Sequence, residues 1–233
     1  MVVEEERYLN PVPPDLRDVA VLVEPLTIAE KSLEQLWTVQ ERLPWRDRVH
    51  RAVVLGAGPV GILGAMALKV EGFEVSVYSR SPNHEEKNRL LGSIDIPYIA
   101  AETHSTEDMA KMAGPFDVVY EATGASGVAF DVLKHLGPNA VFIFTGVPGR
   151  KAPIPLDTDE IMRNMVLNNQ LVLGSVNAPP QAFEAAIRHL GVFAGRWPDT
   201  LRSVITGRFP LERAFDALKP QPGGVKNVVA VHA

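Results

Sequence analysis

The stretch RAVVLGAGPVG, residues 51–61, runs from a hydrophobic strand pattern straight into a glycine-rich turn, and a helical pattern follows it. Each glycine has its own physical reason: Gly56 permits the tight turn, Gly58 lets the backbone come close to a pyrophosphate, and Gly61 lets the helix pack close to the strand. The N-terminus of that helix offers unpaired N–H groups and a positive dipole end. The stretch therefore predicts a dinucleotide site, and a purely structural glycine turn is the alternative.

Composition and charge limit the classes of partner. The chain has 233 residues, of which 46% are hydrophobic and 22% charged, as in ordinary globular proteins. A net charge of -5 without a basic cluster argues against a nucleic-acid partner. The apolar runs are too short for a membrane span, and the first residues lack the pattern of a signal peptide. We therefore expect a cytoplasmic location and no membrane partner. The absence of cysteine excludes disulfides and thiolate metal ligands.

Strand and helix patterns alternate along the middle of the chain. Alternation of this kind indicates a parallel sheet with right-handed crossovers, covered by helices on both faces. The predicted fold class is therefore α/β, a doubly wound parallel (Rossmann) sheet. The expected strands are 52–55, 74–78, 98–100, 117–121, 140–144 and 171–176, and the expected helices between them include 84–91, 105–112, 126–135 and 157–168.

Two further segments flank this core. Residues 1–19 are charged and proline-rich and predict an extended arm, followed by a helix that begins near Pro25 and ends at Pro44. The C-terminal segment predicts helices at 181–193 and 211–218 with strands near 204–205 and at 225–231. We expect three parts: the arm and linking helix at 1–48, the dinucleotide-binding core at 49–178, and C-terminal helices with a final strand at 179–233.

The end of the second strand bears on the choice of cofactor. An NAD site has an acidic residue there for the ribose hydroxyls, but this chain has Ser79, Arg80 and Ser81. A missing carboxylate removes repulsion against a 2′-phosphate, and a guanidinium can bind that phosphate through two charge-assisted bonds. We predict NADP with these three residues as its clamp; the alternative is a solvated arginine in a site that accepts NAD as well.

Three later strand ends belong to the same crevice, because ligands lie beyond the carboxyl ends of parallel strands. Thr123 follows the fourth strand, as a site residue or equally as a helix cap. Asn177 follows the sixth, where its amide faces the cofactor or is a plain turn residue. Thr145, Gly146 and Val147 follow the fifth strand, where small residues let a flat ring approach the backbone.

With these pieces in order, the chain resembles the C-terminal two-thirds of a zinc-dependent medium-chain dehydrogenase, and most of all the archaeal-type glucose 1-dehydrogenases. The resemblance covers about residues 8–231. The glycine turn is shared by all medium-chain dehydrogenases, so VLVEPL and GSVNA are the more selective motifs. The matching segments are VLVEPLTIAEKSLEQ (21–35), VVLGAGPVGILGAM (53–66), FDVVYEATGA (116–125), IFTGVPG (143–149) and NNQLVLGSVNA (168–178).

The resemblance implies an NAD(P)-dependent oxidoreductase of carbohydrate metabolism. Members oxidise the anomeric hydroxyl of an aldose to a lactone by hydride transfer, with a zinc ion polarising the reacting oxygen. By position, Glu24 matches a zinc-site carboxylate that binds metal or contacts the sugar, although from sequence alone it is equally a helix-capping carboxylate. Asn177 matches a residue near sugar and nicotinamide, and Lys226 a basic position that reaches the cofactor phosphates. The turn residues Gly58, Pro59, Val60 and Gly61 match pyrophosphate contacts. The family's backbone contacts to the nicotinamide half are matched by Thr145, Gly146, Val147, Ser175 and Val176.

The family's other zinc ligands, a Cys or Asp and a His-Glu pair, lie in an N-terminal catalytic domain that has no counterpart in these 233 residues. The six histidines show no ligand spacing, and we expect surface or capping positions for them. One carboxylate cannot hold a catalytic zinc, so we expect the chain alone to bind the dinucleotide without dehydrogenase activity. We also expect the final strand, 225–231, to lack its usual partner. Members assemble through the nucleotide domain, which predicts a homo-oligomer.

Three alternatives stay open at this point. The first is a non-catalytic NADPH-binding or scaffold subunit that acts through a partner. The second is a methyltransferase, which shares the sheet and a glycine turn. The third is a neighbouring medium-chain enzyme that acts on a polyol or an alcohol.

Overall fold

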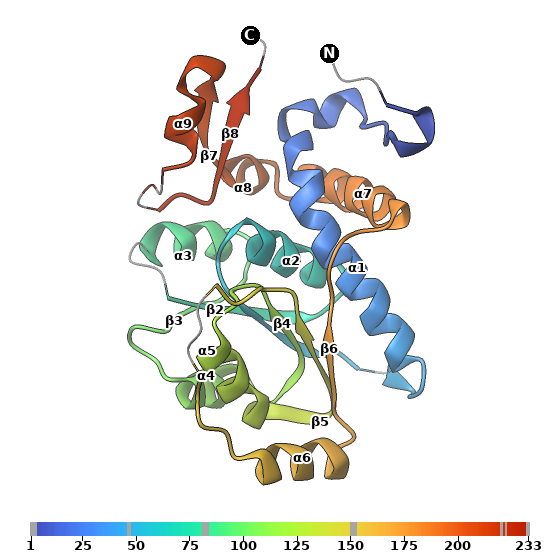
Figure 1. Cartoon of the computed structure of the whole chain (residues 1–233), viewed down its shortest axis with the longest axis vertical. Helices are drawn as coiled ribbons and strands as arrows, with labels where there is room; N and C mark the ends of the chain where they lie inside the picture. The colour runs from blue at the N-terminus through green and yellow to red at the C-terminus, as the bar shows by residue number, and fades with distance from the viewer. Residues whose placement is uncertain are drawn as a thin grey trace.

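A computed structural model describes residues 4–45, 48–80, 84–149, 153–219, 221 and 223–231, without the side chains at positions 7 and 84. A six-stranded parallel sheet forms the centre, in the order β3-β2-β1-β4-β5-β6 (Figure 1). This is the doubly wound α/β fold that the sequence predicted. The strands are β1 (Arg51–Leu55), β2 (Glu74–Ser79), β3 (Tyr98–Ala100), β4 (Phe116–Glu121), β5 (Leu136–Phe144) and β6 (Leu171–Gly174).

Helices cover both faces of the sheet, and successive residues of a strand pack into different layers. In β1, Ala52 and Val54 belong to the hydrophobic cluster under α2 and two helices outside the core, α1 (Val23–Gln40) and α7 (Pro180–Arg196). Val53 and Leu55 belong to the cluster under α4 and α5. A strand buried on both faces needs a continuous apolar run, and this is what the sequence provides. The helices of the core are α2 (Pro59–Val70), α3 (His84–Gly92), α4 (Thr106–Ala113), α5 (Ser126–Val132) and α6 (Thr158–Leu167).

The N-terminal segment differs from the extended arm that was predicted. It forms two 3-10 helices, η1 (Glu6–Tyr8) and η2 (Pro14–Leu22), and continues into α1 (Val23–Gln40). Leu16, Val19 and Leu22 recur every third residue, so a 3-10 helix places all three on one side, where they are buried. The apolar spacing therefore outweighed the proline-rich composition, and α1 begins two residues before Pro25.

The C-terminal segment forms a second, two-stranded sheet in which β7 and β8 are parallel. The final strand was expected to lack its usual partner; within this chain β8 pairs with β7, which is six residues long and extends well beyond 204–205. Figure 1 shows this small sheet on the side of the molecule where α2 and α3 lie. Its elements are α7 (Pro180–Arg196), α8 (Pro198–Ser203), β7 (Ile205–Pro210), η5 (Leu211–Arg213), α9 (Ala214–Ala217) and β8 (Lys226–Ala230).

The hydrophobic cluster under α1 and α7 runs from Leu16 to Ile205. It therefore crosses the boundaries proposed near residues 48 and 178, and the division into three parts stays a prediction. In the described part of the chain, every helix is too short or too polar to traverse a lipid bilayer.

Candidate functional site

The carboxyl ends of five strands meet in register at one edge of the sheet. Leu55 pairs with Tyr78 on one side and with Glu121 on the other, Glu121 pairs with Phe144, and Phe144 with Gly174. Every predicted cofactor loop follows one of these residues. The strand order also reverses between β1 and β4, and such a switch point is where open α/β sheets bind ligands.

The glycine turn after β1 is shaped by its lack of side chains. Gly56 has a φ of 111°, and a Cβ there would lie 2.7 Å from the Thr123 side chain. A Cβ on Gly61 would lie 2.0 Å from the Gly56 carbonyl oxygen, so α2 packs directly onto the turn. A Cβ on Gly58 would meet nothing within 4 Å. Gly58 therefore borders open space, next to the first residues of α2, Pro59 and Val60, as a backbone that approaches a phosphate requires.

Two of the three proposed clamp residues, Ser79 and Arg80, lie at the end of β2. The Ser79 carbonyl oxygen accepts hydrogen bonds from the Tyr98 hydroxyl at 3.0 Å and from the Ala101 amide at 3.2 Å. Arg80 is exposed and forms no hydrogen bond or ion pair with any other described residue. Its guanidinium is thus available to an anion. Ser81 lies outside the described residues.

A carboxylate that is not among the predicted site residues lies at the centre of this edge. Glu121, the last residue of β4, is completely buried, and its carboxylate accepts hydrogen bonds from the loops that follow both β4 and β5. The signal in the sequence was an acidic residue at the end of an otherwise apolar strand, directly before Thr123 and Gly124. Such a residue is costly to bury unless its oxygens are hydrogen-bonded.

Thr123 belongs to this network and not to a helix cap. Its hydroxyl donates to Glu121 at 2.5 Å and accepts from the Ala125 amide at 2.9 Å. The N-cap of α5 is Ala125, which provides no side-chain hydrogen bond. The capping alternative for Thr123 is therefore wrong.

The loop after β5 approaches the loop after β4 closely. The Thr145 hydroxyl donates to the Glu121 carbonyl oxygen at 2.7 Å. A Cβ on Gly146 would lie 2.1 Å from the Gly124 nitrogen, so only glycine fits there. Val147 is 82% exposed. The exposed Val147 side chain and the adjacent Gly146 backbone together form a surface on which a flat ring could lie.

The loop after β6 is tied to α1. Lys31 of α1 donates to the Val176 carbonyl oxygen, while the Val176 side chain is exposed and the Ser175 hydroxyl is buried without a partner among the described residues. Asn177 has a φ of 62°. It is thus in the left-handed turn region with an exposed side chain, and both of its interpretations stay open.

Two predicted site residues lie outside the six-stranded sheet. Glu24 is exposed in the first turn of α1, two turns before Lys31, and its side chain does not cap the helix. Lys226 is half-buried at the start of β8, where its amide donates to Val204. Among the described residues, His, Asp and Glu form no group of three that could hold a metal. A catalytic zinc needs about three protein ligands, so these residues do not by themselves fit one.

Two of the histidines are not the surface residues that were expected. His50 is buried, bonds to the Trp45 carbonyl oxygen and stacks on the Trp45 ring with centroids 3.9 Å apart. His189 of α7 lies between two carboxylates, 2.7 Å from Glu30 and 3.5 Å from Glu71. Burial alone lowers the pKa of His189, but the hydrogen bonds with Glu30 and Glu71 outweigh burial and raise its pKa to about 9.

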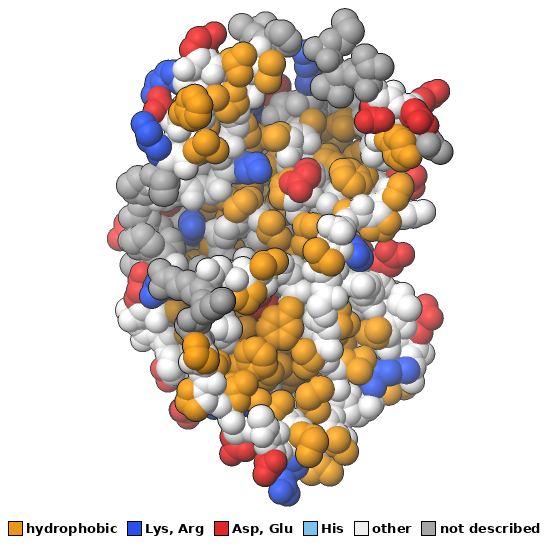
Figure 2. All heavy atoms as spheres, in the orientation of Figure 1, with side chains coloured by type: hydrophobic (Ala, Val, Ile, Leu, Met, Phe, Trp, Pro, Cys, Tyr) orange, Lys and Arg blue, Asp and Glu red, His pale blue; other side chains and the backbone are white. Residues whose placement is uncertain are grey.

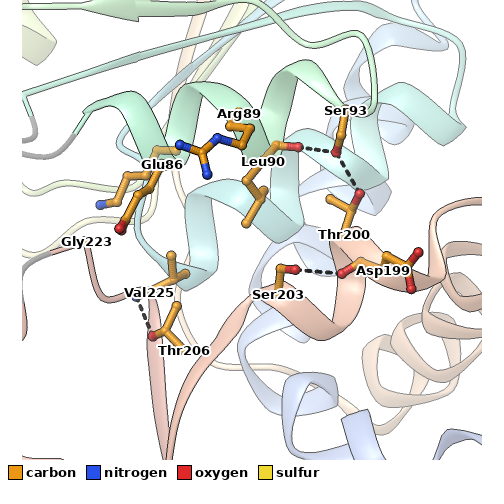
Figure 3. A pocket seen from close by; sticks show the side chains of 11 residues that line it. Glu86, Arg89, Leu90, Ser93, Asp199, Thr200, Ser203, Thr206, Gly223 and Val225 are labelled. Atoms are coloured by element: carbon orange, nitrogen blue, oxygen red, sulfur yellow. Dashed lines mark hydrogen bonds between the residues drawn. The ribbon is translucent and has the colours of Figure 1, made fainter.

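A separate cavity of about 410 Å³ lies between α3 and α8 (Figure 3). One wall is closed by a 2.8 Å hydrogen bond between the Ser93 and Thr200 hydroxyls. Val225, next to Lys226, also lines this cavity, but none of the predicted cofactor residues does. The residues that line the cavity thus differ from the candidate residues in the loops at the carboxyl edge.

The chain is similar to archaeal sugar dehydrogenases over nearly its whole length. It is 36% identical over 230 residues to the glucose 1-dehydrogenase of Methanocella arvoryzae and 36% identical over 233 residues to glucose 1-dehydrogenase 1 of Caldivirga maquilingensis. Each alignment covers 99% of this chain but 64% of the relative. The chain therefore spans a little under two-thirds of the length of these relatives.

A solved structure gives the same relationship. Haloferax mediterranei glucose dehydrogenase, in complex with NADP, Zn and gluconolactone, superposes with a TM-score of 0.89 at 29% identity. The superposition covers 99% of this chain and 64% of that one. The 2R,3R-butanediol dehydrogenase of Bacillus subtilis, at 20% identity and a TM-score of 0.74, shares the fold. The family described as glucose dehydrogenase C-terminus matches residues 17–231, and this chain belongs to it.

Proposed function

We propose that the chain is the NADP(H)-binding portion of a glucose or aldose 1-dehydrogenase. The observation that carries the proposal is the open main chain at Gly58, at the switch point between β1 and β4. The relatives named above, which carry this segment as part of a longer enzyme, support the same conclusion.

The residues at the carboxyl edge would each hold a different part of the dinucleotide. The amides at the start of α2, from Val60 onward, face the pyrophosphate, and the helix dipole favours its negative charge. Arg80, with Ser79 and Ser81, binds the 2′-phosphate, and Lys226 reaches the phosphates from β8. The remaining candidates surround the nicotinamide: Thr123, Thr145, Gly146, Val147, Ser175, Val176 and Asn177.

In the proposed reaction a hydride leaves C1 of the sugar for the nicotinamide as the C1 hydroxyl loses its proton, and a lactone results. The bound cofactor supplies the hydride-accepting chemistry. Glu24 and Asn177 would contact the sugar, and Glu24 is the single candidate in this chain for a metal ligand. Because one carboxylate is too few for a catalytic zinc, we expect no turnover from these 233 residues alone.

The substitution Gly58→Ala tests the proposal. The structure has room for the new methyl group, so folding should be unaffected, but the methyl would occupy the space where a pyrophosphate approaches the backbone. We expect calorimetry to show NADPH binding by the wild-type chain and binding at least about tenfold weaker by the variant.

Gly195→Ala on α7 is the matched control, because its Cβ also meets nothing within 4 Å. It should bind NADPH as the wild type does. If calorimetric titration of the folded wild-type chain shows no binding of NADPH or NADH, the proposal is wrong. Binding of S-adenosylmethionine instead would favour a methyltransferase.

We also propose that the chain forms a homo-oligomer. Figure 2 shows hydrophobic side chains gathered over the lower half of the face, where Figure 1 draws α5, β5 and α6. Met162 and Val166, one turn apart on α6, are 64% and 73% exposed. Sedimentation should give a dimer or larger species that Val166→Lys dissociates; a monomeric wild type contradicts this. The cytoplasmic location stays a prediction.

A further inference from the structure

Glu121 is a completely buried carboxylate with which no described cation forms an ion pair. Its relative exposure is 0%, and none of the described Lys, Arg or His side chains forms an ion pair with it. Its oxygens instead accept hydrogen bonds from N–H and O–H donors of two loops. A buried carboxylate without hydrogen-bond donors would be strongly destabilising, so these donors are needed for the fold.

The two carboxylate oxygens serve different loops. Oε1 accepts from the Thr123 amide at 2.6 Å, the Thr123 hydroxyl at 2.5 Å and the Gly124 amide at 2.8 Å. Oε2 accepts from the Gly146 amide at 3.2 Å. A single side chain therefore joins the loop after β4 to the loop after β5.

The same contacts extend to the glycine turn. The Thr123 methyl group occupies the space where a Cβ on Gly56 would have to lie, at 2.7 Å. Gly124 and Gly146 approach so closely that a Cβ on Gly146 would lie 2.6 Å from the Glu121 Oε2. Glu121 thus fixes the loops after β4 and β5 relative to each other, while the glycine turn faces this network only through the Thr123 methyl group.

We propose that Glu121 is a positioning residue for the nicotinamide half of the dinucleotide, acting through the Thr123 and Gly146 loops. The inference rests on the proposed function, because it assigns the nicotinamide to these loops. The adenosine half lies against different elements, the ends of β1 and β2. Loss of the Glu121 bridge should therefore weaken contacts to one half of the cofactor and leave the other half unchanged.

The substitution Glu121→Gln tests this at nearly constant side-chain volume. A glutamine can keep its oxygen toward Thr123 and Gly124, but its NH₂ group then faces the Gly146 N–H, and two donors cannot bond. We expect NADPH to bind about tenfold more weakly, while adenosine 2′,5′-bisphosphate, which lacks the nicotinamide, binds within about twofold of wild type. The enhancement of NADPH fluorescence on binding should fall as well.

Asp117→Asn is the matched control on the same strand. Asp117 is buried at the opposite end of β4, where it bonds to the Arg48 guanidinium and the Arg51 amide at 2.6 and 2.9 Å. This variant also loses a buried carboxylate, but it should bind both ligands with the wild-type affinity ratio. Equal weakening of both ligands in Glu121→Gln, or an unchanged NADPH affinity, would overturn the inference.

Hydrogen exchange on the wild-type chain gives a second test that needs no variant. The amides of Thr123, Gly124 and Gly146 should exchange slowly before cofactor is added, because the carboxylate already holds them. Fast exchange of all three without cofactor would also overturn the inference. If the wild-type chain binds neither NADPH nor the bisphosphate, the proposed function is wrong. If it binds NADPH no more tightly than the bisphosphate, only the inference about Glu121 is wrong.

Discussion

The Nδ1 atom of His189 lies 2.7 Å from the Glu30 Oε1 and so joins α7 to α1 across 159 residues of sequence. The other ring nitrogen faces Glu71, at the end of α2, whose second oxygen accepts from the Trp37 indole at 3.1 Å. One imidazole thus connects three helices on one face of the sheet. Glu30 is buried, so the histidine provides the positive charge that its carboxylate requires.

The free energy of unfolding should therefore fall as the pH rises from about 6.5 to about 9. The folded-state pKa of His189 is about 9 against an ordinary 6.5, so protonated His189 stabilises the fold. Its contribution is complete below pH 6.5 and lost as pH rises to about 9. Because the pair is partly open to solvent, we expect a loss of about 1–2 kcal/mol in urea unfolding.

His189→Gln can still donate to Glu30 but does not titrate, so its unfolding free energy should change little across that pH range. His104→Gln, a control at a partly exposed histidine far from this cluster, should keep the wild-type dependence. A His189→Gln curve parallel to wild type would contradict the assignment.

Gly61→Ala should act through folding, in contrast to Gly58→Ala. Its Cβ would lie 2.0 Å from the Gly56 carbonyl oxygen, and a backbone atom cannot move aside as a side chain can. We expect a loss of about 3 kcal/mol in denaturant unfolding, at the upper end of ordinary overpacking. A Gly61→Ala chain as stable as Gly58→Ala would mean that α2 does not pack on the turn as described.

Arg80→Asp should separate the two nicotinamide cofactors. The new carboxylate repels a 2′-phosphate and can accept from the ribose hydroxyls of NADH. NADPH binding should weaken by at least about tenfold, with NADH affinity changed by less than about twofold. Arg163→Asp on α6 makes the same charge change at an exposed position far from the β2 end, and should leave both affinities alone. Equal losses for the two cofactors would remove Arg80 from the clamp.

Much of the core and its edge could be predicted from the sequence because local rules decide them. A strand with four consecutive apolar residues, a turn that needs a φ of 111° at Gly56, and a helix that begins with Pro59 and Val60 all lie within a dozen residues. Alternation of strands with helices then predicts the parallel sheet and its binding edge. The limits of the strands were predicted less accurately than their number and order: β5 begins at Leu136, four residues before the predicted start.

The sequence by itself thus determined the sheet, the glycine turn and the loops that surround the proposed cofactor site. Only the tertiary structure decided that the segment before α1 is helical, that β8 pairs with β7, that His189 lies between two carboxylates, and that Glu121 is buried among its donors. The physical reason is that these features depend on groups distant in sequence. Whether a carboxylate or an imidazole is solvent-exposed or removed from water depends on the hydrogen-bond partners that folding brings to it. Residue type alone does not reveal those partners.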